Sequence, residues 1–237
     1  MDAHARPGSG FNLPRYLAMQ PLFQEMDAAE LERLAQGCTL HRLTRGDMVF
    51  RVGEHCEAFH VTVTGQVKLF VISPTGAEKV IEIMGPGQSF AEALMFTGRP
   101  YILNAQALAD SLVLSIAKSA VLAEIQNDPR FALRMLAGIS RRLHGLVHDV
   151  ESYALHSGLQ RVIGYLLRDH SAEDCVSGEV ITVSLPVSKA TIASRLSLTP
   201  EYFSRVLHEL EAEGLVHIDK RDVHILDAQR LSRYHPR

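Results

Sequence analysis

Residues 188–214 constrain the fold of this chain more than any other stretch, because they contain two short helical patterns separated only by residues 196–198. The second pattern has the clearer boundaries. Thr199 suits an N-cap, where its hydroxyl accepts a free amide of the first turn, and Pro200 suits the first helical position. Gly214 stands where a left-handed C-cap is expected. The stretch therefore predicts two helices joined by a tight turn.

The second helix of this pair is amphipathic. Its apolar residues recur at i, i+3, i+4 and i+7: Phe203, Val206, Leu207 and Leu210. Its polar residues lie on the opposite face: Glu201, Ser204, Arg205 and His208. In a helix-turn-helix the second helix enters the major groove of DNA, where an arginine suits guanine and a glutamate suits cytosine. We therefore interpret this helix as a recognition helix; the alternative is a surface helix with a Glu201–Arg205 ion pair.

Two strand patterns follow the helices. Residues 215–218 and 223–226 are expected to form strands around a polar turn at residues 219–222. A helix-turn-helix followed by a hairpin is a winged helix. Because the net charge is −3, DNA binding requires a local basic face. The residues available for it are Lys189, Arg195, Arg205, Lys220 and Arg221.

The composition is that of a globular protein without membrane segments. The chain has 237 residues, of which 46% are hydrophobic and 22% charged, enough for two ordinary domains. No apolar run approaches the length of a membrane helix, and the N-terminus lacks the order of a signal peptide. Cys38, Cys56 and Cys175 are too far apart to indicate a disulfide framework or a C-x-x-C metal site. We expect a cytoplasmic protein.

Short strands separated by glycines dominate residues 39–116, which predicts a β-sandwich or barrel. An antiparallel β-roll, closed on itself, has an interior that can hold one small ligand. A short helix at residues 27–36, with Asp27 and Glu30 at capping-box spacing, precedes it. Residues 85–96 lead from a turn into a brief helix, in which Glu92 suits a ligand cradle or lid. The alternative is an ordinary strand-to-helix corner whose apolar residues are core: Phe90, Leu94, Met95 and Phe96.

A long helix is expected over residues 130–154, after a short one at residues 118–127 that ends before Asp128 and Pro129. Its apolar residues form a three-heptad seam: Ala132, Leu136, Ile139, Leu143, Leu146, Val150 and Tyr153. A narrow seam of this kind usually pairs with a second copy, and a dimer presents two recognition helices to a palindrome. The alternative is packing on its own domain.

The predicted fold is therefore α+β. We expect a mobile tail at residues 1–20, the β-roll sensor domain at 21–128, the dimerisation helix at 129–154 and the winged helix DNA-binding domain at 155–237. No catalytic motif such as G-x-S-x-G, H-E-x-x-H or a phosphate loop occurs, so an enzyme is not expected.

From about residue 20 onward the chain resembles the CRP/FNR superfamily of bacterial transcription regulators. Three stretches carry the resemblance: residues 90–96 (F-A-E-A-L-M-F), 139–144 (I-S-R-R-L-H) and 199–205 (T-P-E-Y-F-S-R). The resemblance implies a jelly roll like the cyclic-nucleotide-binding domain, a homodimer, double-stranded DNA as ligand and RNA polymerase as a partner.

The E-x-x-S-R pattern of Glu201, Ser204 and Arg205 is similar to the FNR branch of that superfamily, whose members recognise TTGAT-N4-ATCAA-like palindromes. The resemblance implies four further residues in the DNA interface: Lys189, Thr199, Pro200 and His208. It likewise places the effector pocket at Phe90, Glu92, Met95, Phe96 and Arg99.

The effector is expected to differ from those of the best-known branches. Ile102 stands where cyclic-AMP binders have a phosphate-binding arginine, and a buried phosphate without a placed cation is costly. No cysteine precedes Cys38, so an iron–sulfur cluster with four thiolates is not expected. The chain looks most like the Dnr-type branch, activators that respond to nitric oxide through haem. Candidate haem ligands are His41, His55, His60, His144 and His148.

Two alternatives stay open. One is a cyclic-nucleotide-dependent regulator of the CRP type. The other is a sensor that acts through a protein partner without binding DNA, an alternative supported only by the nearly neutral charge of the C-terminal domain.

Overall fold

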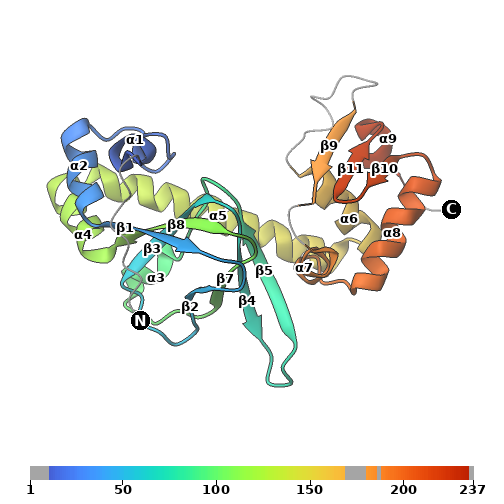
Figure 1. The fold of residues 1–237 in the computed structure, drawn as a ribbon, viewed down its shortest axis with the longest axis horizontal. Helices are drawn as coiled ribbons and strands as arrows, with labels where there is room; N and C mark the ends of the chain where they lie inside the picture. Colours follow the sequence, from blue (N-terminus) through green and yellow to red (C-terminus); the bar gives the residue numbers. More distant parts are fainter. Residues whose placement is uncertain (1–10, 169–179, 186–187, 235–237) are drawn as a thin grey trace. The chain divides into compact units, whose positions relative to one another are not determined.

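The structure is a computed structural model that describes residues 11–168, 180–185 and 188–234. The chain forms two compact units, which Figure 1 shows coloured along the sequence. The first unit comprises Met1–Ile72 and Ile81–Gly145, and the second comprises Ser73–Val80 and Leu146–Arg237. No helix of the described residues is long and apolar enough to span a membrane.

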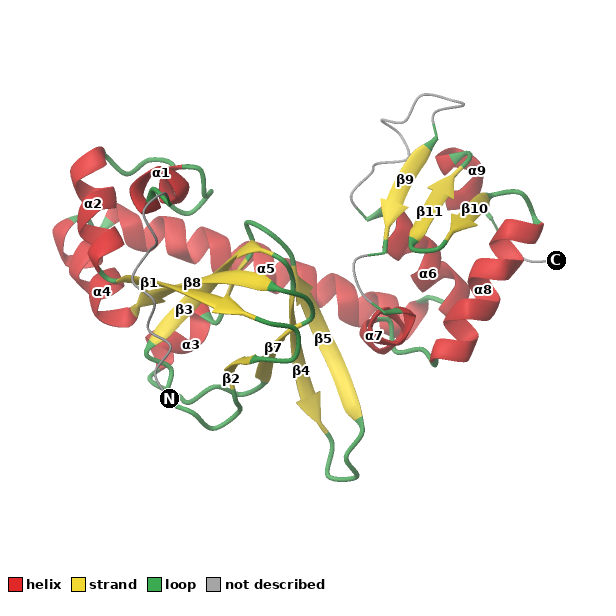
Figure 2. Ribbon diagram, viewed as in Figure 1, coloured by secondary structure: helices red, strands yellow, loops and turns green. Residues whose placement is uncertain are grey.

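Residues 38–117 form two four-stranded antiparallel sheets, which confirms the predicted β-roll (Figure 2). One sheet has the order β1-β8-β3-β6: β1 (Cys38–Leu43), β8 (Ser111–Ala117), β3 (Ala58–Thr64) and β6 (Ser89–Phe90). The other has the order β2-β7-β4-β5: β2 (Met48–Phe50), β7 (Asn104–Ala107), β4 (Val67–Ile72) and β5 (Glu78–Met84). Strand neighbours that are far apart in sequence, such as β1 and β8, close the roll.

Aromatic and aliphatic side chains fill the core of the first unit. The Phe23 ring lies 6.5 Å from Phe59 and 6.0 Å from Phe131, between ring centroids, so segments before and after the sheets share one core. At Gly65 the turn backbone has a φ of 79°. A Cβ there would lie 2.2 Å from the Ser111 hydroxyl, so glycine is required where this turn approaches β8.

Short helices accompany the sheets. α2 (Ala28–Gln36) has the predicted capping box, since the Asp27 carboxylate accepts from the Glu30 amide at 2.8 Å and Glu30 accepts from the Asp27 amide at 2.7 Å. The brief helix expected after the turn at residues 85–90 is α3 (Glu92–Thr97). α4 (Lys118–Asn127) has the predicted bounds.

The expectation of a mobile tail over residues 1–20 is wrong for α1 (Leu13–Ala18). The Asn12 side chain caps this helix by accepting from the Arg15 amide at 2.9 Å, and Leu17 is fully buried. A helix of six residues is too short to show helical periodicity, so the sequence pattern did not reveal it. Residues 1–10 lie outside the described residues.

The predicted long helix is confirmed as α5 (Arg130–Leu155), and both units contain part of it. α6 (Gly158–Leu167) follows. Its N-cap is Ser157, whose hydroxyl accepts from the Gln160 amide at 3.2 Å while the Gln160 side chain accepts from the Ser157 amide at 2.9 Å.

The second unit is a winged helix. After α6 come β9 (Ile181–Ser184), α7 (Lys189–Arg195), α8 (Pro200–Ala212), β10 (Val216–Asp219), β11 (Asp222–Ile225) and α9 (Ala228–Ser232). The three strands form a sheet of order β10-β11-β9. The predicted wing strands are confirmed, but their turn is tighter than expected. Because Asp219 and Asp222 pair across the strands, only Lys220 and Arg221 connect them, with Lys220 at a φ of 55°.

Candidate nucleic-acid interface

The N-terminus of α8 is fixed as the sequence predicts. The Thr199 hydroxyl accepts from the Tyr202 amide at 3.2 Å, and Pro200 occupies the first helical position. Just beyond the helix, Gly214 has the left-handed φ of 64° that its C-cap role requires. The four apolar residues predicted to form one face are buried: Phe203, Val206, Leu207 and Leu210. The helix therefore presents one defined face outward.

The residues expected to read bases lie on that outward face. Glu201, Arg205 and His208 are exposed, and Ser204 is half-buried. The guanidinium carbon of Arg205 lies 4.8 Å from the centroid of the Tyr202 ring. Among the described residues, no hydrogen bond or ion pair engages Arg205, so the Glu201–Arg205 ion pair of the alternative interpretation is not formed. The donors of Arg205 are thus available to a ligand.

The turn before α8 holds the helix pair together. Ser197 adopts the left-handed conformation, with a φ of 56°, and the Leu198 amide donates to the Ala193 carbonyl at 2.8 Å. A left-handed serine costs about 1 kcal/mol, which the packing of the two helices must offset. The N-cap of α7 is Ser188, whose hydroxyl accepts from the Thr191 amide at 3.2 Å.

Side chains from α5 and α6 clamp the C-terminus of α7. The Tyr153 hydroxyl donates to the Arg195 carbonyl at 2.6 Å, and an Arg161 N–H donates to the Leu196 carbonyl at 2.7 Å. These bonds satisfy carbonyls that a helix end leaves without partners. The Arg195 side chain, only 12% exposed, pairs with Asp149 at 2.6 Å. Arg195 therefore does not contribute to the basic face that we expected from the sequence.

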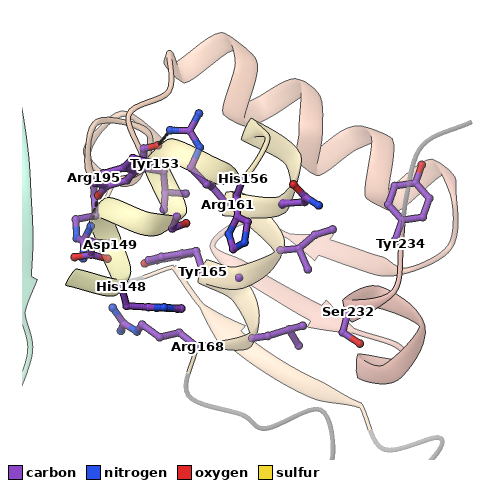
Figure 3. Close-up of a pocket in the computed structure, with 16 residues that line it drawn as sticks. His148, Asp149, Tyr153, His156, Arg161, Tyr165, Arg168, Arg195, Ser232 and Tyr234 are labelled. Carbon is purple, nitrogen blue, oxygen red and sulfur yellow. Dashed lines mark hydrogen bonds and ion pairs between the residues drawn. The ribbon is translucent and has the colours of Figure 1, made fainter. Parts of the chain in front are cut away.

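A cavity of about 570 Å³ lies beside this clamp, and Figure 3 shows the side chains around it. They come from the end of α5, from α6, from the end of α7 and from the region of α9. Two of its cations already have partners: Arg195 has Asp149, and Arg161 has the carbonyls at the end of α7. Of the residues that we expected to contact DNA, only Arg195 lines the cavity, and it is paired with Asp149. We therefore regard this region as the anchor of α7.

The remaining members of the predicted basic face lie around the helix pair and the wing. Lys189 is half-buried at the start of α7, and Lys220 and Arg221 are exposed at the wing turn. Cations at such positions suit contacts with DNA phosphates, which orient a protein on the duplex but carry no sequence information.

The predicted seam residues of α5 fall into two groups. Four are exposed apolar side chains: Leu136 at 57%, Leu143 at 59%, Leu146 at 38% and Val150 at 66%. Ile139 is half-buried, and Tyr153 is half-buried with its hydroxyl bonded to Arg195. Sequence reasoning missed the exposed Leu133 and Val147, which flank the seam one helical turn or less away. The apolar strip on α5 is therefore wider than the heptad pattern alone indicates.

The five residues predicted to form the effector pocket do not share one environment. Phe90 and Met95 are fully buried in the roll core, and Glu92 is buried at 8% exposure. Phe96 and Arg99 are exposed, as is Ile102. The alternative interpretation, in which the apolar residues of this corner belong to the core, is therefore confirmed for Phe90 and Met95. Leu94 is partly buried and packs against the core, whereas the interpretation is wrong for the exposed Phe96.

One candidate haem ligand, His60, has both ring nitrogens engaged in hydrogen bonds. The side chain is buried, and Nδ1 is bonded to the Ser115 hydroxyl at 2.9 Å and Nε2 to the Tyr101 hydroxyl at 3.0 Å. Burial lowers the pKa of His60 to about 3, so the ring is neutral at physiological pH. A metal bound by His60 would have to break one of these bonds.

The sequence did not reveal this network, because Ser115 is brought to His60 by the β3–β8 register and Tyr101 comes from the loop before β7. Tyr101 also stacks on Phe50, with ring centroids 3.7 Å apart. Of the other histidines, His41 is half-buried, while His55, His144 and His148 are exposed. Within the described residues, no group of three or more His, Cys, Asp and Glu side chains could hold a metal ion.

Comparisons with known proteins agree with this architecture. Residues 40–128 match the cyclic nucleotide-binding domain family, and residues 160–234 match the Crp-like helix-turn-helix domain family. The crystal structure of DNR from Pseudomonas aeruginosa is 36% identical, covers 93% of this chain and 96% of its own, and has a TM-score of 0.50.

Two curated relatives are similar over most of their length. The transcriptional activatory protein AadR of Rhodopseudomonas palustris is 29% identical over 86% of this chain and 83% of its own. The CRP-like cAMP-activated global transcriptional regulator of Mycobacterium tuberculosis is 24% identical over 92% of this chain and 97% of its own.

Proposed function

Because the chain belongs to the CRP/FNR family of DNA-binding transcription regulators, we propose that it is a homodimer that recognises a TTGAT-N4-ATCAA-like palindrome. The observation that carries this proposal is the outward face of α8. Glu201 and Arg205 are exposed there on the first two turns of a capped helix, and the Arg205 donors are not engaged by other described residues. A recognition helix reads bases with residues at this position.

Each residue of the interface has a proposed part. Arg205 binds the guanine of each half-site through O6 and N7, Glu201 accepts from a cytosine amino group, and Ser204 donates to a neighbouring base. Thr199 and Pro200 set the direction of α8 by capping it. Lys189, with Lys220 of the wing, neutralises phosphates, and His208 lies farther along the same exposed face.

The dimer is proposed to form along α5. The exposed side chains of Leu136, Leu143, Leu146 and Val150 make an apolar strip that a second copy of the helix would cover in coiled-coil fashion. Ile139 contributes its partly exposed side. Tyr153, first predicted as a seam residue, is proposed to hold α7 instead, since its hydroxyl is bonded there.

We further propose that the β-roll senses an effector, with haem and nitric oxide as the first candidates, because residues 91–96, 104–107 and 142–144 are similar to the Dnr-type branch. His60 does not fit as a ligand. The exposed His144 and His148 share a face of α5 at i,i+4, so they would hold haem on the helix that follows the roll. Haem bound there would supply an iron atom that takes up nitric oxide. The regulator would act in the cytoplasm as an activator, through contact with RNA polymerase.

A visible spectrum tests the haem proposal. Haem added to the purified chain is expected to give a shifted Soret band that changes again with nitric oxide, and His144→Ala with His148→Ala is expected to alter it. An unchanged spectrum of free haem would remove haem from the account without affecting DNA recognition.

A second candidate effector is a cyclic nucleotide, which the family match over residues 40–128 favours. The buried Glu92 suits a ribose hydroxyl, but the exposed Ile102 offers no charge for a cyclic phosphate. Calorimetric titration with cyclic AMP separates the candidates: saturable binding by the parent, lost in Glu92→Gln, would favour the cyclic nucleotide.

A gel shift with a set of duplexes tests the DNA proposal. The palindrome is expected to be retarded at lower protein concentration than a scrambled duplex of the same composition, and each base change in TTGAT is expected to weaken binding. Equal retardation of all duplexes would favour a sensor that acts through a protein partner.

A further inference from the structure

The side chain of Tyr202 contacts both Arg205 and the first residue of α6. The Arg205 guanidinium lies over its ring, with 4.8 Å between the guanidinium carbon and the ring centroid. A Cβ added to Gly158 would lie 2.5 Å from Cε1, 2.8 Å from Cζ and 2.9 Å from the hydroxyl oxygen of Tyr202. The ring therefore rests on the bare backbone of Gly158 at one site and supports Arg205 at another.

Stacking on Tyr202 restricts the conformations of the Arg205 side chain but leaves its N–H groups free to donate hydrogen bonds. Residues at i and i+3 of a helix lie on the same face, so the stacking is built into α8. A free arginine loses rotamer freedom when it binds a base, and a guanidinium already held on an aromatic face loses less. The planar group keeps its N–H edge available, and that edge makes the paired hydrogen bonds with guanine.

We propose that Tyr202 is a positioning residue that pre-orients Arg205 for base recognition, and that Gly158 is small in order to seat the Tyr202 ring. The inference rests on the proposed function, because it assigns a role to Tyr202 in the reading of DNA by Arg205. It adds that the start of α6 sets the direction of a base-reading side chain on α8.

The first experiment is a double-mutant cycle on DNA affinity. Tyr202→Leu removes the aromatic face and is expected to weaken binding to the palindrome roughly fivefold per half-site. The penalty for replacing the guanine of TTGAT is expected to shrink, while affinity for a scrambled duplex stays as in the parent. In an Arg205→Ala background the same change is expected to alter affinity by less than about twofold, because the residue it positions is gone.

Two further variants separate positioning from a packing defect. Tyr202→Phe keeps the ring and is expected to restore the base preference that Tyr202→Leu loses. Gly158→Ala has no positive φ to strain and places a methyl group on the ring, so it is expected to weaken specific binding with Tyr202 present but not in the Tyr202→Leu background.

α6 supplies a matched control. The guanidinium carbon of Arg168 lies 5.6 Å from the centroid of the Tyr165 ring. The two residues are again at i and i+3, but they lie outside the recognition helix. Tyr165→Leu is therefore expected to leave the base preference unchanged. Circular dichroism of every variant reports whether the winged helix is folded.

The outcomes are distinguishable. If Arg205→Ala binds all duplexes as the parent does, the proposed function fails. If Arg205→Ala loses specificity but Tyr202→Leu weakens binding equally in both backgrounds, or if Tyr165→Leu changes base preference to the same extent, the positioning role of Tyr202 is wrong and the DNA-reading role of Arg205 stands.

Discussion

The outward face of α8 and the interior of the β-roll use polar side chains in opposite ways. On α8, the exposed Glu201 and Arg205 lie on the face opposite the buried apolar residues, and Arg205 stacks on Tyr202 without a hydrogen bond or ion pair to any other described residue. In the roll, the polar atoms of His60 are bonded to Ser115 and Tyr101 and withdrawn from water. Polar groups without protein partners on a rigid helix indicate a binding surface, whereas mutually satisfied buried groups indicate structural specificity.

The largest effect is expected from breaking the apolar strip of α5, since a binding face on α8 needs a second copy to read a palindrome. Leu143→Glu with Val150→Glu is expected to give a monomer and to weaken palindrome binding at least about 100-fold, because two linked half-sites bind far more tightly than one. Analytical ultracentrifugation and gel shift measure both. Leu122→Glu, at an exposed apolar position on α4, is the matched control and is expected to remain dimeric. A double variant that stays dimeric would place the interface elsewhere.

The next effect concerns the α8 face itself. Arg205→Ala is expected to cost about 1–3 kcal/mol per half-site and to relax preference at one base. Lys220→Ala, at the wing turn, is expected to weaken binding to all sequences alike and to reduce its salt dependence. Fluorescence anisotropy at several salt concentrations distinguishes the two patterns. Equal loss on specific and scrambled duplexes for Arg205→Ala would make it a phosphate contact.

The buried His60 of the β-roll predicts that the stability of the protein depends on pH. In the folded protein the pKa of His60 is lowered to about 3 from its ordinary 6.5. The stability that the neutral ring contributes to the folded state is therefore fully present above pH 6.5 and is lost as the pH falls toward 3. Between pH 6.5 and 5 the loss is about 2 kcal/mol in the free energy of unfolding. Urea unfolding followed by circular dichroism is expected to show a flatter pH dependence for His60→Gln than for the parent.

The exposed His55 supplies the control for that measurement. His55→Gln is expected to follow the parent curve, since the His55 side chain is exposed and His60 is unchanged. If His60→Gln and the parent lose stability in parallel below pH 6.5, the buried neutral state assigned to His60 is wrong.

The smallest effect tests whether Thr199 caps α8 or contacts a base. Its hydroxyl accepts from the Tyr202 amide, so Thr199→Ala is expected to cost about 1 kcal/mol of stability. DNA affinity is expected to fall uniformly, with base preference retained. Thermal unfolding and the duplex panel measure both, and Thr199→Ser is expected to behave as the parent. A changed base preference in Thr199→Ala would instead assign the hydroxyl to the DNA.

Local signals explain why so much of the winged helix was predictable. Thr199, Pro200 and Gly214 mark the ends of α8 within one stretch of sequence, and the apolar spacing between them needs no distant partner. Asp27 and Glu30 mark α2 in the same way. Such features depend on contacts three or four residues apart.

The candidate site in the roll was less predictable because it depends on distant pairing. Which of Phe90, Met95 and Phe96 is buried depends on how α3 turns after Ala91, a non-glycine residue with a φ of 71°. The partners of His60 are Ser115, placed by the β3–β8 register, and Tyr101, which comes from the loop before β7. Arg195 was assigned to a basic face because its sequence position does not reveal Asp149, which lies 46 residues earlier.

Binding stoichiometry on defined duplexes tests the central claim most directly. Fluorescence anisotropy compares a TTGAT-N4-ATCAA duplex, a single half-site and a scrambled duplex, with and without haem and nitric oxide. In the tighter-binding condition we predict two chains per palindrome and an affinity at least about 1,000-fold above that for the scrambled duplex. One chain per palindrome, or equal affinity for all three duplexes in every condition, would contradict the account.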